Sequence, residues 1–205
     1  MDAGSLMVKT MAKLAIADPP YLGTAELFYG DEGLGYDKGL KTTSNTNPHA
    51  HLWDNADTHL ELIDYLKDNF DSYAIALNTH SLGVYSKRIK FGSQSGFRIC
   101  SWIRPNSAPT GSRIRPSWEP VIIYNAKNRR SYGSGLPRTK DYLIANPPRS
   151  QFIGTKPFEW TEWVTELLGY QEGDTMSDLF VGSGAVTSAL IELNVLMDDE
   201  TYWVQ

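Results

Sequence analysis

The sequence predicts an α/β protein in which helices cover both faces of a mainly parallel sheet. Three observations support this class. Short apolar runs alternate with segments of helical periodicity along the 205 residues. The first apolar run ends in an acid and two prolines, and the last ends in a glycine turn that precedes a helix. Open α/β sheets bind ligands beyond the carboxyl ends of their strands, so both turns are candidate sites.

The first strand is predicted over residues 13–17, KLAIA, because this run is short and apolar. The tetrapeptide DPPY at 18–21 ends the strand, since proline has no N–H for a sheet ladder and restricts its own φ. Residues 22–55 are rich in Gly, Asn, Thr and Asp and are predicted to be irregular. A loop of this length is usually either functional or disordered.

Two helices and a second strand are predicted next. Leucine and isoleucine recur at helical spacing over residues 57–69, with acids on the opposite face, which predicts an amphipathic helix. Residues 72–78, SYAIALN, are predicted to form a buried strand. A further helix is expected over residues 80–89.

The middle of the chain contains two more predicted strands, 97–103 and 119–124, which read FRICSWI and EPVIIY. Turn-forming residues and arginines separate them. Residues 125–155 are predicted to be mostly loop. A helix is predicted over 157–168, because Pro157 suits a first helical position and acids occupy the first turns.

The last strand is predicted over residues 175–180, and a helix follows from 185 to about 193. Gly182 and Gly184 between them allow the backbone to bend tightly and approach a ligand, and the helix behind them begins with free N–H groups. This arrangement suits a nucleoside-bearing cofactor, and its alternative is a simple tight turn. No Gly-Lys-Ser/Thr follows the turn, which excludes a P-loop.

The charge is unevenly distributed, although the formal net charge is only −5. Residues 84–156 contain 14 of the 19 Lys and Arg and only two acids, Glu119 and Asp141, so this segment carries +12 and the rest carries −17. A basic segment in an acidic body predicts a nucleic-acid contact surface. The alternative is a solvated loop region that is rich in arginine by chance.

Composition excludes several classes of protein. Cys100 is the single cysteine, so neither a disulfide framework nor a cysteine zinc site can form within one chain. The histidines have no companions at ligand spacing, and we predict no metal site. No apolar run approaches the ~20 residues of a membrane span, and the N-terminus lacks a secretory signal. We therefore expect a soluble, intracellular protein without a membrane partner.

Three motifs together resemble the β-class, circularly permuted DNA amino-methyltransferases, which use S-adenosylmethionine. They are DPPY at a strand end, the Lys-Pro segment TKPFEW at 155–160, and DLFVGSG at 178–184, in that order. The resemblance implies a Rossmann-like methyltransferase fold in a single domain, residues 1–205, with 84–156 as a loop-rich insertion that reads the target. It implies a small, phage-like enzyme of the cytoplasm of a bacterium or phage-infected cell, which methylates the N6 amine of adenine in DNA.

The resemblance also implies roles for individual residues. The catalytic motif comprises Asp18, Pro19, Pro20 and Tyr21. The implied cofactor-binding residues are Lys156, Phe158, Asp178, Phe180, Gly182, Ser183 and Gly184. The basic residues expected to contact DNA, mainly through phosphates, are Arg104, Arg113, Arg115, Lys127, Arg129, Arg130 and Arg138. The two aromatic residues of the cofactor set have core packing as an equally good explanation.

The sequence departs from the family pattern at its end. The chain stops 21 residues after Gly184, which predicts a shortened sheet edge and favours, weakly, a homodimer. Asp198, Asp199 and Glu200 are the candidate acids for the ribose hydroxyls, and the sequence does not choose among them. The Asn-Pro-Pro at 146–148 is predicted to be a turn.

Three alternative functions share these motifs. Methylation of cytosine N4 uses the same fold, and "DPP" instead of "SPP" favours adenine through resemblance only. RNA is an alternative substrate, because a basic segment does not distinguish the two nucleic acids. A non-catalytic nucleic-acid-binding protein that retained the fold is the third alternative.

Overall fold

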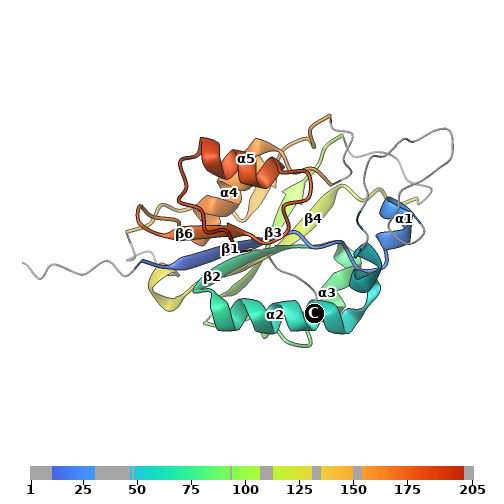
Figure 1. The fold of residues 1–205 in the computed structure, drawn as a ribbon, viewed down its shortest axis with the longest axis horizontal. Helices are drawn as coiled ribbons and strands as arrows, with labels where there is room; N and C mark the ends of the chain where they lie inside the picture. The colour runs from blue at the N-terminus through green and yellow to red at the C-terminus, as the bar shows by residue number, and fades with distance from the viewer. Residues whose placement is uncertain are drawn as a thin grey trace, which may run out of the picture.

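The computed structural model describes residues 11–30, 47, 49–92, 94–106, 113–130, 135–149 and 154–200. In this part of the chain, a six-stranded sheet in the order β5-β3-β4-β2-β1-β6 separates two layers of helices (Figure 1). The strands are β1 Lys13–Ala17, β2 Ser72–Ala76, β3 Phe97–Ile103, β4 Trp118–Tyr124, β5 Tyr142–Ile144 and β6 Thr175–Asp178. The α/β class with helices on both faces is confirmed.

The sheet is mostly parallel. β1 runs parallel to both β2 and β6, and β3 runs parallel to β5. β4 is antiparallel to its two neighbours, β2 and β3. Beyond β6, a single parallel bridge joins Met176 to Met197 at this edge.

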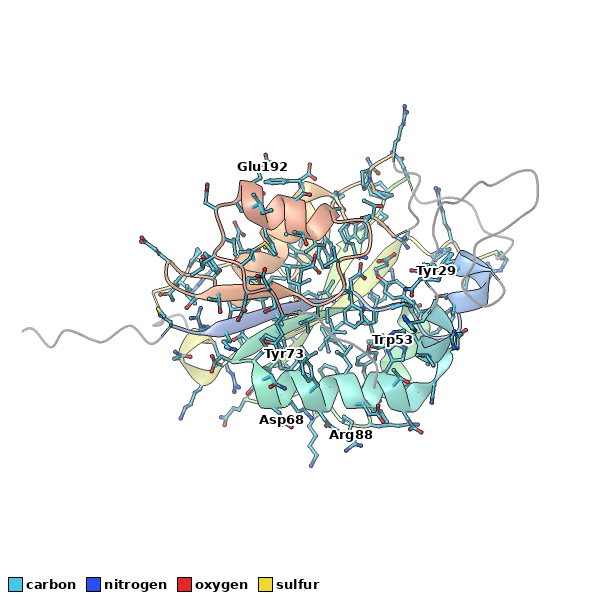
Figure 2. The ribbon with its side chains drawn as sticks, in the orientation of Figure 1. Tyr29, Trp53, Asp68, Tyr73, Arg88 and Glu192 are labelled. Atoms are coloured by element: carbon cyan, nitrogen blue, oxygen red, sulfur yellow. The ribbon has the colours of Figure 1, made fainter. Side chains whose placement is uncertain are left out.

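Two central strands are buried on both faces, which explains their continuous apolar sequences. In β1, Leu14 and Ile16 pack under α4 (Phe158–Leu168) and α5 (Ala185–Glu192), whereas Ala15 and Ala17 face α2 (Ala56–Asn69). Figure 2 shows the resulting layers, with side chains filling the space between the sheet and the helices. The alternation of core-facing residues therefore fixes which helix covers which face of the sheet.

The predicted helices over 57–69, 157–168 and 185–193 are confirmed to within about two residues. The side chain of Asn55 accepts a hydrogen bond from the N–H of Asp57 and so caps α2. Pro157 precedes α4 as its N-cap instead of occupying its first turn. Gly169, at a φ of 66°, ends α4 in the left-handed conformation that glycine adopts readily. None of the described helices is long and apolar enough to cross a membrane.

Four short elements of the described residues occur where the sequence predicts loop. These are α1 (Ala25–Tyr29), η2 (Ala50–Asp54), η4 (Lys127–Arg129) and β5. The carboxylate of Asp54 accepts from the N–H groups of Gly23 and Thr24, at 2.7 and 3.1 Å, so a contact distant in sequence supports the start of α1. The predicted helix over 80–89 is shorter and forms as η3 (Thr79–Ser81) and α3 (Leu82–Tyr85).

A buried ion pair lies at the end of the sheet where β1 and β6 begin. Arg129, at the end of η4 (Lys127–Arg129), lies 2.9 Å from Asp174, and both side chains are almost fully buried. The Asp174 carboxylate also accepts from the N–H groups of Ala12 and Gln171. One carboxylate thus joins the starts of two strands to the loop after β4.

Replacing Asp174 with Asn should destabilise the protein by about 3–5 kcal/mol, because the Arg129 guanidinium would remain buried without its charge partner. Asp198→Asn is a matched control, since its ion pair with Lys13 is exposed and should contribute less than about 1 kcal/mol. Denaturant unfolding measures both changes. Equal losses of unfolding free energy in the two variants would contradict the structural role of the buried pair.

Candidate active site

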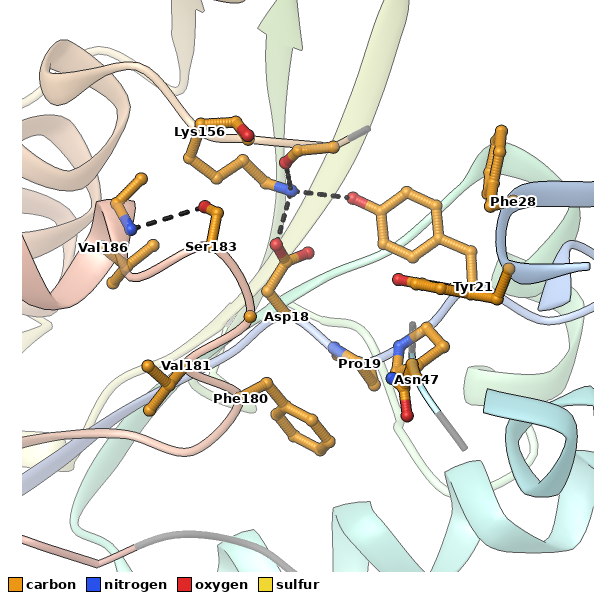
Figure 3. Close-up of a pocket in the computed structure, with 16 residues that line it drawn as sticks. Asp18, Pro19, Tyr21, Phe28, Asn47, Lys156, Phe180, Val181, Ser183 and Val186 are labelled. Atoms are coloured by element: carbon orange, nitrogen blue, oxygen red, sulfur yellow. Dashed lines mark hydrogen bonds and ion pairs between the residues drawn. The ribbon is translucent and has the colours of Figure 1, made fainter. Parts of the chain in front are cut away.

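A cavity of about 330 Å³ opens at the carboxyl ends of β1 and β6 (Figure 3). Three parts of the chain form it: the DPPY turn, the segment that precedes α4, and the glycine turn that precedes α5. Helix α1 and the loop after it contribute further residues. The lining comprises Asp18, Pro19, Pro20, Tyr21, Phe28, Tyr29, Asn47, Gly154, Thr155, Lys156, Phe180, Val181, Gly182, Ser183, Ala185 and Val186.

The strand register explains why two distant turns share this cavity. β1 and β6 are adjacent and parallel, with Ile16 opposite Asp178. The turns that follow these strands therefore leave the sheet side by side, 160 residues apart in sequence. Proline at positions 19 and 20 prevents β1 from continuing past this point.

Lys156 forms an ion pair with Asp18 in the wall of the cavity. Its Nζ lies 2.7 Å from Asp18 Oδ2, 3.1 Å from the carbonyl of Gly154 and 3.3 Å from the hydroxyl of Tyr21. These three acceptors match the three hydrogens of an ammonium group. The Lys156 side chain is only 2% exposed, and that of Asp18 is 21% exposed.

Aromatic rings surround this ammonium group. Lys156 Nζ lies 5.5 Å from the ring centre of Tyr21, 5.8 Å from that of Trp102 and 5.5 Å from that of Trp160. Ring faces carry negative potential and favour a cation at this range. The rings therefore add to the stabilisation that the Asp18 carboxylate provides.

The hydroxyl of Tyr21 also donates to a second carboxylate. Glu119 Oε2 accepts this hydrogen bond at 2.8 Å, and Glu119 Oε1 lies 2.7 Å from Arg104 Nη1. Burial, together with the negative charges of Glu119 and Asp18, raises the pKa of Tyr21 well above its ordinary value. Tyr21 is therefore protonated and remains a hydrogen-bond donor.

The glycine turn brings backbone and one buried acid to the other side of the cavity. Gly182 and Gly184 have φ values of 49° and 75°, which glycine adopts without strain. Asp178 is buried beneath this turn, where burial raises the pKa of its carboxyl group. Its Oδ2 accepts from Thr187 at 2.8 Å, whereas its Oδ1 has no hydrogen-bond partner among the described residues. A positively charged ligand group would satisfy this oxygen.

Two solved DNA methyltransferases share the general arrangement of these strands and helices. M1.HpyAVI, solved as a complex with SAM, aligns with a TM-score of 0.52 over 91% of this chain and 81% of its own, at 16% identity. The PvuII DNA methyltransferase, described as cytosine-N4-specific, aligns with a TM-score of 0.57 over 91% of this chain and 73% of its own, at 13% identity. The chain has a fold like that of these two proteins. No protein-family model and no curated protein matches its sequence.

Within this fold, the predicted motif residues come together. The whole DPPY tetrapeptide and four of the predicted cofactor residues line the cavity, namely Lys156, Phe180, Gly182 and Ser183. Asp178 precedes the glycine turn and Gly184 ends it, and neither residue lines the cavity. Phe158 begins α4, is 37% exposed and does not line the cavity either.

Sequence reasoning missed several functional candidates. Phe28, Tyr29 and Asn47 line the cavity but belong to the segment predicted to be irregular, where no periodic signal marks them. Glu119 contacts Tyr21 and Arg104, and one feature of the sequence could have identified it. It is one of only two acids in the basic segment, and an isolated acid among cations is a candidate for a structural ion pair.

The predicted DNA-contacting residues lie at two opposite ends of the sheet, one near the cavity and the other where β1 and β6 begin. Arg104 lies at the cavity edge, where it donates to the carbonyl of Pro116. Arg113 and Arg115 are exposed just before that proline. Lys127 and Arg129 lie in the segment after β4, at the opposite end of the sheet from the cavity. Arg129 is buried there and is therefore not available to contact nucleic acid.

The other two predicted contacts also lie away from the cavity. Arg130, next to the buried Arg129, donates to the carbonyls of Asn125 and Gln94. Arg138 is exposed and lies two residues before Lys140, whose carbonyl accepts from Trp163 in the middle of α4.

Acids near the described end of the chain contact the body of the protein. Lys13 Nζ lies 3.8 Å from Asp198 and 4.0 Å from Glu200, and Glu200 also accepts from the hydroxyl of Tyr65. Asp199 is exposed. Among the described residues, no group of three or more His, Cys, Asp or Glu is placed to hold a metal ion.

A buried histidine supports the back wall of the cavity. Trp53 packs edge-on against Phe180, a lining residue, and against His59. The Nε2 of His59 donates to the Trp53 carbonyl and its Nδ1 accepts from the Tyr85 hydroxyl, each at 2.8 Å. This tautomer is neutral, and burial lowers the pKa of His59 below its ordinary value.

The titration of His59 should make the protein less stable in mild acid. The unfolded chain takes up a proton as pH falls below about 6.5, whereas the folded chain resists protonation, so unfolding free energy declines from that pH downward. His59→Gln should remove this part of the decline in denaturation curves between about pH 5 and 8. Exposed His80→Gln serves as the control. If the decline in His59→Gln matched that of the wild type, the neutral buried histidine would be refuted.

Proposed function

We propose that this protein transfers the methyl group of S-adenosylmethionine to the N6 amine of adenine in DNA. The observation that carries the proposal is the shared cavity, in which the Asp18 turn and the glycine turn face one another. A volume of about 330 Å³ falls in the range of small-molecule sites. The resemblance of the DPPY motif to adenine-specific members is what favours adenine over cytosine.

The chain's own part in this chemistry is to orient a weak nucleophile. The lone pair of an exocyclic amine is delocalised into the base, and two acceptors that hold its hydrogens draw the nitrogen toward a tetrahedral geometry. Asp18 and the Pro19 carbonyl are the two acceptors. Both prolines keep this turn rigid, so the acceptors need no ordering during reaction, and such positioning can contribute ~7–11 kcal/mol.

Lys156 supports Asp18 in this proposal instead of binding the cofactor. All three ammonium hydrogens of Lys156 already face acceptors of the chain itself. The pair occupies Asp18 Oδ2 and leaves Oδ1 for an amine hydrogen. Lys156 also offsets part of the negative charge that would otherwise accumulate beside the cavity.

The glycine turn and Asp178 fit the cofactor's methionine portion. Asp178 Oδ1 is buried and unpartnered among the described residues, and it suits an ammonium group. Gly182 and Gly184 allow the backbone to approach the ligand, and Phe180 borders its flat adenosyl group. When bound, S-adenosylmethionine supplies an electrophilic methyl group attached to sulfonium sulfur.

The experiment that tests the proposed function is transfer of a labelled methyl group from S-adenosylmethionine to unmethylated duplex DNA. Wild type should label the DNA, and nucleoside mass spectrometry should identify N6-methyladenine. Asp18→Ala should lose at least about 100-fold in rate, because an acceptor for the amine is lost. Asp178→Asn should instead weaken cofactor binding in calorimetry by about tenfold or more.

The products and the variants also separate the alternatives. N4-methylcytosine, or labelled RNA with unlabelled DNA, would replace the proposed substrate by one of its rivals. Full activity in Asp18→Ala would remove the catalytic motif from the mechanism. Absence of cofactor binding at millimolar concentration would leave a nucleic-acid-binding protein that retained the fold.

DNA should contact the cavity edge through Arg113 and Arg115. The double variant Arg113→Gln/Arg115→Gln should bind duplex DNA more weakly and lower the slope of log K against log salt by about two, since each phosphate contact contributes about 0.9. Arg98→Gln/Lys127→Gln removes the same charge from exposed residues at the opposite edge and should leave the slope unchanged. Equal slopes in both double variants would contradict a DNA surface at the cavity edge.

A further inference from the structure

Glu119 lies at the junction between the basic segment and the catalytic motif. It occupies the second position of β4, and its residue exposure is 9%. Both carboxylate oxygens are engaged: Oε1 by Arg104 at 2.7 Å and Oε2 by the Tyr21 hydroxyl at 2.8 Å. A buried acid with both oxygens committed holds its partners in one geometry.

The hydrogen bonds around Glu119 have only one consistent direction. Lys156 is a pure donor, so it donates both to Asp18 and to the oxygen of Tyr21. Tyr21 then has its single hydroxyl hydrogen left, and Glu119 is the acceptor within reach. Arg104 donates to the other oxygen of Glu119. A continuous chain therefore leads from an arginine at the cavity edge to the catalytic carboxylate.

We propose that Glu119 is a positioning residue that holds the ring of Tyr21, and through it the Lys156–Asp18 pair, in the geometry required for methyl transfer. This inference rests on the proposed function, in which Tyr21 belongs to the catalytic motif and lines the cavity where the methyl group is transferred. The hydroxyl fixes the far end of the Tyr21 ring through Glu119 and Lys156, while the ring packs against the hydrophobic core. Without the acceptor at Glu119, the Tyr21 hydroxyl loses one of these two anchors, and the oxygen that accepts from Lys156 is held less firmly.

Glutamate is required at this position because two donors converge on it. A carboxylate only accepts, whereas a glutamine would direct its NH₂ group at either Arg104 or Tyr21. Aspartate keeps the charge but is one methylene shorter, so its carboxylate can bond well to Arg104 or to Tyr21 but not to both. Glu119→Gln and Glu119→Asp thus separate the contribution of the charge from that of the reach.

The test compares Glu119→Gln, Tyr21→Phe and the double variant in methyl transfer. Glu119→Gln should lower kcat about 10-fold to 100-fold, while cofactor affinity stays within about twofold of wild type. If Glu119 acts through the Tyr21 hydroxyl, the double variant should be little slower than Tyr21→Phe alone. Glu119→Asp should recover part of kcat. Glu166→Gln, which removes an exposed acid of α4, should match wild type.

Multiplicative effects on kcat, or an unchanged kcat in Glu119→Gln, would overturn the positioning role. Wild type, Glu119→Gln, Tyr21→Phe and the double variant also form a double-mutant cycle for the free energy of unfolding, which does not depend on activity. A wild type that transfers no methyl group would count against the proposed function. In that event, coupling between the two changes in unfolding would still support Glu119 as the anchor of Tyr21, and additivity would overturn it.

Discussion

The ion pair between Lys156 and Asp18 is the interaction on which the site depends. A charge that is removed from water needs a partner, and Lys156 is nearly fully buried. Asp18 ends β1, whereas Lys156 precedes α4, so the pair ties the helix layer to the carboxyl edge of the sheet. The rings of Tyr21, Trp102 and Trp160 enclose the ammonium group and exclude water from it. The same contacts therefore pack the site and orient the Asp18 carboxylate.

Charged groups of opposite sign are paired along this side of the molecule. Glu119 binds Arg104, and Asp18 binds Lys156. Positive and negative groups thus alternate from Arg104 through Glu119 and Lys156 to Asp18. At the opposite end of the sheet, Arg129 and Asp174 form a buried pair in the same way.

The sequence predicted the elements with a strong local signal and missed those formed by distant contacts. Strands β1, β2, β3, β4 and β6 and helices α2, α4 and α5 follow from apolar runs, periodicity and capping residues. Helix α1 depends on Asp54, and β5 depends on its ladder with β3, so neither has a local signature. The two turns were identifiable because their prolines and glycines have direct backbone consequences. The burial of Arg129 and the engagement of all three Lys156 hydrogens follow only from tertiary packing, which composition does not report.

The most direct test of the Lys156–Asp18 pair is nitrogen-15 NMR of the lysine side-chain ammonium groups. An ammonium that is buried and bonded to three acceptors exchanges its hydrogens slowly and should give a distinct, protected signal at neutral pH. That signal should vanish in Asp18→Asn and persist in Asp198→Asn, whose partner Lys13 is exposed. A wild type with no protected ammonium, or a protected signal that Asp18→Asn leaves unchanged, would contradict the arrangement of the site.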